Sequence, residues 1–179
     1  WGRKMDTLTM CDLIQLCTLN GITTFDHADI YGSYTTEADF GEAFIKSGIK
    51  RSELQFITKC GIKLISPNRQ NRVAHYDYTK EHIINSCNRS LTNLKTDYLD
   101  LFLLHRPSPL MDGAEIAEAI AILKEQGKIL DIGLSNFTPS QTELIRKYIP
   151  VRYNQIEFSL THHMSMTDGS LDHMRLYGI

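Results

Sequence analysis

The chain has 179 residues, of which 42% are hydrophobic and 22% are charged, and its formal net charge is -2 at pH 7. This composition is typical of an ordinary globular protein with enough apolar residues to bury a core. Acidic and basic residues are interspersed without a basic stripe, which argues against nucleic acid as a partner. No apolar run approaches the ~20 residues that span a bilayer, so we expect no membrane partner either.

The four cysteines indicate a reducing environment. Cys11, Cys17, Cys60 and Cys87 lie in apolar segments and form no C-x-x-C pair. Such residues are typical of buried thiols rather than of disulfides or zinc ligands. We therefore expect a cytoplasmic protein.

Short apolar runs rich in β-branched residues recur along the chain and predict strands. They lack strict alternation, which is typical of strands buried on both faces. The runs cover residues 22–25, 54–58, 98–104, 129–134 and 151–156.

Helical patterns separate these runs. Residues 10–19 and 79–94 carry apolar residues at helical spacing. Asp112 with Glu115 opens a third helix that ends at Gly127. The segment from Thr138 to Gln141 has a capping Thr, then Pro, then Gln, which predicts a helix start.

Alternating helices and strands predict one domain over residues 1–179, with a parallel sheet. An open doubly wound sheet and a (β/α)₈ barrel both satisfy this pattern. A whole barrel typically needs ~250 residues and eight strands, so the five runs favour the open sheet on length alone. As a barrel, the chain would be incomplete.

Polar residues follow or interrupt each apolar run. The carboxyl ends of parallel strands open onto one face, where the loops build a site, so we expect these side chains to converge. They are Asp26, Lys59, His105, the pair Ser135 and Asn136, and Gln155.

Acid catalysis by a phenol would use four of the residues near these strand ends. A phenol with an ordinary pKa near ~10 is a poor acid at neutral pH. We expect Lys59 to lower the pKa of Tyr31, and Asp26 to hold Lys59 charged and in position. His105 would orient a carbonyl oxygen between itself and Tyr31. This chemistry needs a hydride donor, which the chain itself does not supply.

In order along the chain, "DHADIYG", "ITKCG", "DYLDLFLLHRP", "IGLSNF" and "YNQIEFS" resemble the aldo-keto reductase family, and most closely its bacterial oxidoreductase branch. The resemblance implies an α/β fold, a (β/α)₈ TIM barrel, here with about five to six βα units. It also implies an NADPH-dependent enzyme that reduces an aldehyde or ketone, with Tyr31 as proton donor, Asp26 and Lys59 tuning it and His105 orienting the carbonyl. By the same resemblance, Asp26, Ser135, Asn136 and Gln155 would bind the cofactor.

The two ends of the chain depart from the family pattern. Trp1-Gly2 resembles the end of the first strand-to-helix connection, and Ile179 stands where a seventh strand would begin. We therefore expect a barrel without its first and last strands and without the site for the adenosine 2'-phosphate. As an entire polypeptide, such a chain would bind NADPH poorly and turn over slowly or not at all.

Two other functions fit parts of the sequence. A truncated barrel of this family could serve as a catalytically silent cofactor-binding or interaction protein. A metal-dependent barrel hydrolase could use Asp26, His27, Asp29 and His105, but the H-x-H pair or bridging carboxylates are lacking. The adjacent His162 and His163 point in different directions, so we expect no metal there.

Simpler interpretations apply to two residues after the first predicted strand and to one long connection. We interpret His27 and Asp29 as loop residues, with Asp29 solvated or capping the next turn. The connection over residues 61–78 is long for a βα loop and is either a lid or substrate loop or a surface excursion.

Overall fold

The structure is a computed structural model that describes residues 5–179. Its main feature is a five-stranded parallel sheet in the order β1-β2-β5-β6-β7. The strands are β1 (Thr24–Asp26), β2 (Gln55–Cys60), β5 (Leu99–Leu104), β6 (Ile129–Ser135) and β7 (Asn154–Gln155). A separate antiparallel hairpin joins β3 (Ile62–Lys63) to β4 (His75–Tyr76).

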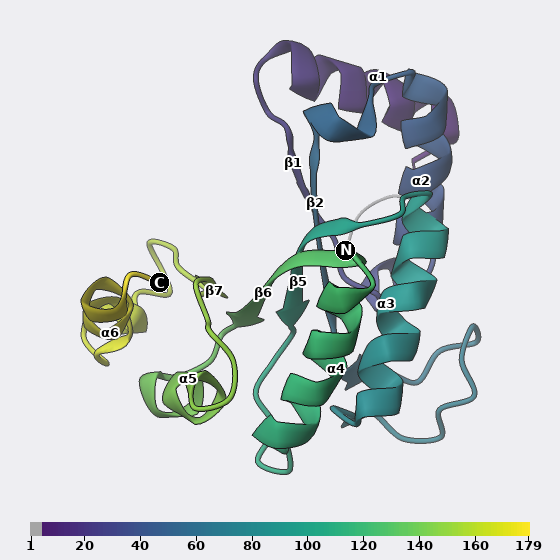
Figure 1. Ribbon diagram of the computed structural model, residues 1–179. Coiled ribbons are helices and arrows are strands. Elements are labelled where there is room, and N and C mark those ends of the chain that lie inside the picture. The colour runs from purple at the N-terminus through teal and green to yellow at the C-terminus, as the bar shows by residue number, and fades with distance from the viewer. Residues whose placement is uncertain (1–4) are drawn as a thin grey trace.

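The described residues form six helices (Figure 1). They are α1 (Thr7–Leu19), α2 (Thr36–Ser47), α3 (Lys80–Leu94), α4 (Gly113–Glu125), α5 (Pro139–Arg146) and α6 (Ser170–Tyr177). Of these, α2 to α5 connect strands of the parallel sheet. Short 3₁₀ turns cover Tyr31–Ser33, Arg51–Glu53 and Met164–Met166. Within the described part of the chain, none of the helices is long and apolar enough to cross a membrane.

The sheet has the strand order of a barrel. An open doubly wound sheet reverses its order at a switch point, whereas these five strands lie side by side in chain order. Consecutive helices also pack against each other, α1 on α2, α2 on α3 and α3 on α4, along one side of the sheet (Figure 1). The preference for an open sheet on length alone is therefore wrong. The expected end of a missing first connection at Trp1-Gly2 lies outside the described residues.

Three of the four expected helix starts are confirmed by their caps, while α1 begins at Thr7, after its cap Asp6, instead of at residue 10. The Thr138 hydroxyl accepts from the Gln141 backbone N–H while the Gln141 side chain accepts from the Thr138 N–H, a complete capping box. The Asp112 side chain accepts from the backbone N–H groups of Ala114 and Glu115 at the start of α4, and Thr79 caps α3. These caps fix where each outer helix leaves its strand.

The central strands match their apolar runs, but the two edge strands differ. The first lies at residues 24–26 instead of 22–25, because the exposed Ile22 precedes the pairing with β2. The last is only Asn154–Gln155, because only these residues pair with β6. The hairpin β3–β4 and helix α6 are absent from the sequence-based prediction.

The cysteines are free thiols. Cys11, Cys60 and Cys87 are buried and Cys17 is half-buried. The prediction of thiols rather than disulfides is therefore confirmed, with Cys17 less covered than expected.

Arg51 joins the amino ends of β2 and β5, away from the strand ends where we expect the site. Its guanidinium donates to the Asp100 carboxylate at 2.6 Å and to the carbonyls of Leu54 and Tyr98. It also lies 4.1 Å from the ring centroids of both Phe56 and Tyr98. Only a planar, multi-donor cation satisfies these partners together.

We expect Arg51→Leu to lower the free energy of unfolding by about 3 kcal/mol, because it leaves the half-buried Asp100 carboxylate without its cation. Arg51→Lys should recover less than half of this loss, since one ammonium cannot replace the planar set of guanidinium donors. Urea unfolding measures both. Arg152→Leu is the control, since Arg152 is exposed. Full recovery by Lys would contradict the role given to the guanidinium geometry.

Candidate active site

Lys59 is a buried cation whose hydrogen bonds are all directed at the end of β1. Its Nζ donates to both carboxylate oxygens of Asp26, at 2.8 and 2.7 Å, and to the His27 carbonyl at 2.8 Å. The three N–H groups of the ammonium are thereby satisfied. Burial lowers the pKa of Lys59, while the hydrogen bond and charge of Asp26 act in the opposite direction. The Asp26 carboxylate is therefore the counter-charge of Lys59 and fixes the position of its ammonium.

Tyr31 opens the 3₁₀ turn that follows β1. Its ring centroid lies 5.3 Å from Lys59 Nζ, and 38% of the residue is exposed. Burial raises the pKa of the Tyr31 phenol, and the charge of Asp26 raises it further. The expectation that Lys59 lowers this pKa is therefore wrong. The reason is that Lys59 directs its hydrogen bonds at Asp26 and His27, and the charge of Asp26 acts on the phenol more strongly than the charge of Lys59 does.

His105 follows β5 and lies beside Tyr31. The two rings meet edge to face with centroids 6.0 Å apart. The His105 backbone N–H donates to the Cys60 carbonyl, which places it level with the end of β2. Burial, followed by the charges of Lys59 and Arg106, lowers the pKa of His105 to about 4. The imidazole is therefore neutral at pH 7 and carries one N–H that can donate to a carbonyl oxygen.

Ser135, Asn136 and Gln155 lie together where β6 and β7 end. Ser135 is paired with Gln155 in the parallel register, and the Asn136 side chain donates to Ser135 Oγ at 3.3 Å. Asn136 has a left-handed backbone, φ 56°, a conformation that Asn tolerates better than most residues. Its Oδ1 accepts from the Glu157 N–H, which fixes the loop beyond β7.

A nicotinamide carboxamide fits the residues at this end. It needs one acceptor and one donor, and the exposed Gln155 amide makes no hydrogen bond to residues 5–179. The Ser135 hydroxyl, on the paired position of the next strand, is a second polar group at the same level. Ser135, Asn136 and Gln155 together can therefore hold such a group beside His105, whose strand β5 is paired with β6.

His27 and Asp29 are buried, in contrast to the expectation of loop residues in solvent. His27 packs between Phe40 and Phe56, with ring centroids 4.3 and 6.2 Å away, and burial lowers its pKa to about 3. Asp29 is 7% exposed and accepts from the Ser86 hydroxyl at 2.7 Å. It caps no helix. The prediction of a solvated or capping Asp29 is therefore wrong.

Glu37 is a residue that the sequence-based prediction missed. It is 3% exposed, and its carboxylate accepts from the Thr58 hydroxyl at 2.6 Å, directly before Lys59 on β2. Its position did carry a signal, because Glu37 shares a helix face with Phe40 and Phe44 at spacings of three and seven. A charge on that apolar face indicates a paired, buried carboxylate.

Tyr78, also missed, links the hairpin to the site. Its hydroxyl donates to the Arg106 carbonyl and accepts from the Arg106 N–H, one residue past His105. Its ring lies where a Cβ on Gly61 would stand, and Gly61 has φ +108°. A glycine is therefore needed at the point where the chain leaves β2.

In the described range, no group of three or more His, Cys, Asp or Glu side chains is arranged to hold a metal ion. The strand-end residues instead bring together a cation paired with a carboxylate, a phenol beside that cation, and a neutral imidazole beside the phenol. That set suits proton transfer and polarisation of a carbonyl.

Known proteins resemble this chain in sequence. Residues 2–179 match the profile described as Aldo/keto reductase family. An uncharacterized oxidoreductase, YcsN of Bacillus subtilis, is 47% identical over 166 residues, which are 91% of this chain and 55% of that protein. A 6-dehydroglucose reductase of Agrobacterium fabrum is 40% identical over 165 residues, 90% of this chain and 56% of its own. The chain thus spans about half the length of the curated relatives it matches.

The fold is shared with solved structures. The glycerol dehydrogenase AKR11B4 from Gluconobacter oxydans superposes with a TM-score of 0.84 at 25% identity, over 99% of this chain and 53% of that one. The sheet of parallel strands in chain order is therefore part of a (β/α)₈ barrel. Together with the family match over nearly the whole sequence, this shows that the chain belongs to the aldo/keto reductase family.

Proposed function

We propose that the protein containing this chain reduces an aldehyde or ketone to an alcohol with NADPH, and that Tyr31 is the proton donor. The observation that carries the proposal is the contact of a neutral His105 with the Tyr31 ring, beside the buried Lys59 and its exposed partner Asp26. A carbonyl oxygen placed between Tyr31 and His105 would accept one hydrogen bond from each. As negative charge develops on that oxygen, Tyr31 transfers its proton to it.

The cofactor site is proposed at the ends of β6 and β7. Asp26, Ser135, Asn136 and Gln155 would bind NADPH, the last three through the carboxamide of the nicotinamide. The nicotinamide supplies the hydride when it is bound. The choice of NADPH over NADH is part of the proposal and follows the usual preference in this family.

The substrate is proposed as a small carbonyl compound. One relative is named as a reductase of 6-dehydroglucose, so a sugar aldehyde belongs in the first panel beside aromatic aldehydes and diketones. We further propose a cytoplasmic location for the enzyme, and that residues 1–179 belong to one domain of it. The free thiols support a reducing compartment.

Replacing Tyr31 by Phe is expected to lower kcat for carbonyl reduction by about 10²- to 10⁴-fold, because the general acid is lost. The dissociation constant for NADPH should stay unchanged, since the phenol is assigned no role in holding the cofactor. NADPH consumption gives kcat, and fluorescence titration gives the dissociation constant. The protein is used at full length.

Tyr34→Phe is the matched control for Tyr31→Phe. Tyr34 lies three residues further on and its hydroxyl accepts from the Leu64 N–H, away from His105. Full activity in Tyr31→Phe would contradict the proposed acid. A full-length protein that binds NADPH but reduces nothing in the panel would favour the catalytically silent alternative.

The alkaline limb of the pH profile tests how Asp26 acts on Tyr31. Reduction needs protonated Tyr31, so activity is lost as pH rises through the pKa of Tyr31, which the structure raises. In Asp26→Asn the charge that raises this pKa is gone while Lys59 remains. We therefore expect the limb of kcat against pH to move to lower pH. A limb that stays in place or moves up would exclude Asp26 as an electrostatic partner of the phenol.

A further inference from the structure

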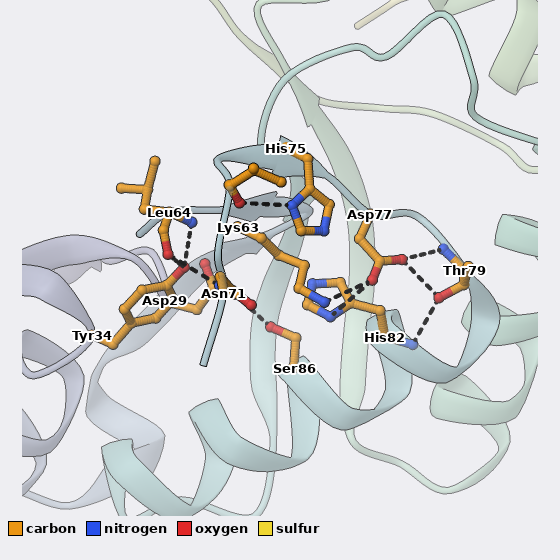
Figure 2. A network of polar contacts seen from close by, with 11 residues as sticks. Asp29, Tyr34, Lys63, Leu64, Asn71, His75, Asp77, Thr79, His82 and Ser86 are labelled. Atoms are coloured by element: carbon orange, nitrogen blue, oxygen red, sulfur yellow. Dashed lines mark hydrogen bonds and ion pairs between the residues drawn. The ribbon is translucent and has the colours of Figure 1, made fainter. Parts of the chain in front are cut away.

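A polar cavity of about 170 Å³ lies next to the candidate active site and separate from its reacting groups. It is enclosed by the loop after β1, the β3–β4 hairpin and helix α3, the region drawn in Figure 2. Its volume has room for several waters or one tetrahedral oxyanion. Its polar lining is Asp29, Lys63, Arg69, Asn71, His82 and Arg89.

Three cations line the cavity, and two of them have no carboxylate partner. Lys63 Nζ forms an ion pair with Asp77 at 3.1 Å. Within residues 5–179, neither Arg69 nor Arg89 forms an ion pair. Arg69 stacks on Tyr34 at 4.2 Å and donates only to its neighbour's carbonyl, so most of its donors are free. Unpaired guanidinium groups around a cavity favour an anion with several oxygens.

Asp29, at the buried side of the cavity, has one oxygen without a partner. The Ser86 hydroxyl donates to Oδ2, while Oδ1 is buried and makes no hydrogen bond to the described residues (Figure 2). His82, whose side chain is 9% exposed, likewise has a buried Nε2 without a partner. Buried polar atoms without partners are costly, so both atoms indicate that something polar occupies the space between them.

From this arrangement we propose that the cavity binds a small tetrahedral oxyanion, with Arg69 and Arg89 neutralising it and a proton on Asp29 Oδ1 donating to one of its oxygens. The site is distinct from the proposed carbonyl and nicotinamide sites. It touches them through the backbone, because the Asp29 N–H donates to the Lys59 carbonyl at 3.2 Å.

The surroundings of Asp29 support a protonated carboxyl. Burial raises its pKa to about 7, and the carboxylate of Glu37 on α2 raises it as well. Ser86 and Arg89 on α3 and Arg69 in the hairpin loop act in the opposite direction. His82 also faces the cavity, but burial lowers its pKa to about 4, so that it stays neutral between pH 6 and pH 8. Across that range the carboxyl of Asp29 ionises, and anion binding should weaken as pH rises.

The test is a titration of the full-length protein with sulfate, at constant ionic strength and with saturating NADP⁺ present. The quantity measured at each sulfate concentration is the midpoint of unfolding. Sulfate carries the same charge at pH 6 and pH 8, and NADP⁺ fills the phosphate sites of the cofactor. Sulfate also stabilises proteins in general by exclusion from their surface, an effect that grows without saturation. The expected result is a saturable rise on top of this general trend.

Variants separate the site from general salt effects. Arg69→Gln and Arg89→Gln should each weaken the saturable component by about tenfold or more, since each removes a charged partner. Arg72→Gln is the matched control, because Arg72 is in the same loop and exposed but does not line the cavity. A purely linear sulfate effect in the unmodified protein, or an unchanged saturable component in both Arg variants, would overturn the proposal.

The pH arm tests the role of Asp29. The protonated fraction of a group with a pKa of about 7 falls from about nine-tenths at pH 6 to one-tenth at pH 8, so sulfate affinity should fall by about tenfold. In Asp29→Asn, which donates an N–H at every pH, affinity should vary by less than about twofold. Equal pH dependence in both proteins would remove Asp29 from the site.

A last arm identifies the source of the anion. Methyl sulfate presents three terminal oxygens and a single negative charge on an ester, as a sulfate ester of a larger metabolite would. Tighter binding of sulfate supports a free inorganic anion as the ligand, and tighter binding of methyl sulfate supports the charged end of a larger molecule. Binding of neither ion overturns the site.

Discussion

The site depends on one requirement, which is that the buried ammonium of Lys59 must find three acceptors. A buried cation without partners would cost several kcal/mol, so the chain following β1 has to deliver them. It does so with the Asp26 carboxylate and the His27 carbonyl. This fixes the course of residues 26–31 and hence the position of Tyr31. In the parallel register of β1 and β2, Asp26 is paired with Ile57, two residues before Lys59 on the same strand.

The sequence was sufficient to predict helices and strands that are determined by residues adjacent in the chain. The capping box at Thr138 depends on four adjacent residues, and it stands in the structure as predicted. Buried central strands also carry their own signal, because a run such as residues 99–104 is apolar on both faces. The hairpin β3–β4 lacks such a signal. Each of its strands has two residues, and its position depends on Tyr34, Asn71 and Ser66, which contact it or the loop around it.

The choice between an open sheet and a barrel shows the limit of an argument from length. Both folds alternate strands and helices, so the pattern of residues 22–156 could not separate them. Strand order separates them, and order is a property of tertiary pairing. Only the polar residues at the strand ends, taken with their resemblance to a known family, indicated the barrel.

Charge states could not be predicted from the sequence either. Asp26, Asp29 and Glu37 lie within twelve residues, yet their surroundings differ. Asp26 contacts Lys59 and solvent. Asp29 lies at the buried side of the polar cavity, beside Ser86. Glu37 accepts a hydrogen bond from the hydroxyl of Thr58 on β2. The residues "DHADIYG" alone do not indicate how deeply each carboxylate is buried. The sequence-based prediction therefore identified Asp26 as the partner of Lys59 but gave the wrong surroundings for Asp29.

The raised pKa of Tyr31 is compatible with its proposed role as the acid. The group that receives its proton is an oxygen that becomes an alkoxide, whose conjugate acid has a pKa near that of water, ~16. A phenol above its usual ~10 is still the stronger acid of the two, so the transfer remains favourable. A raised pKa also keeps the phenol protonated over the whole neutral range. The Lys59–Asp26 pair therefore serves to hold the end of β1, and with it Tyr31, in place and not to ionise Tyr31 in advance.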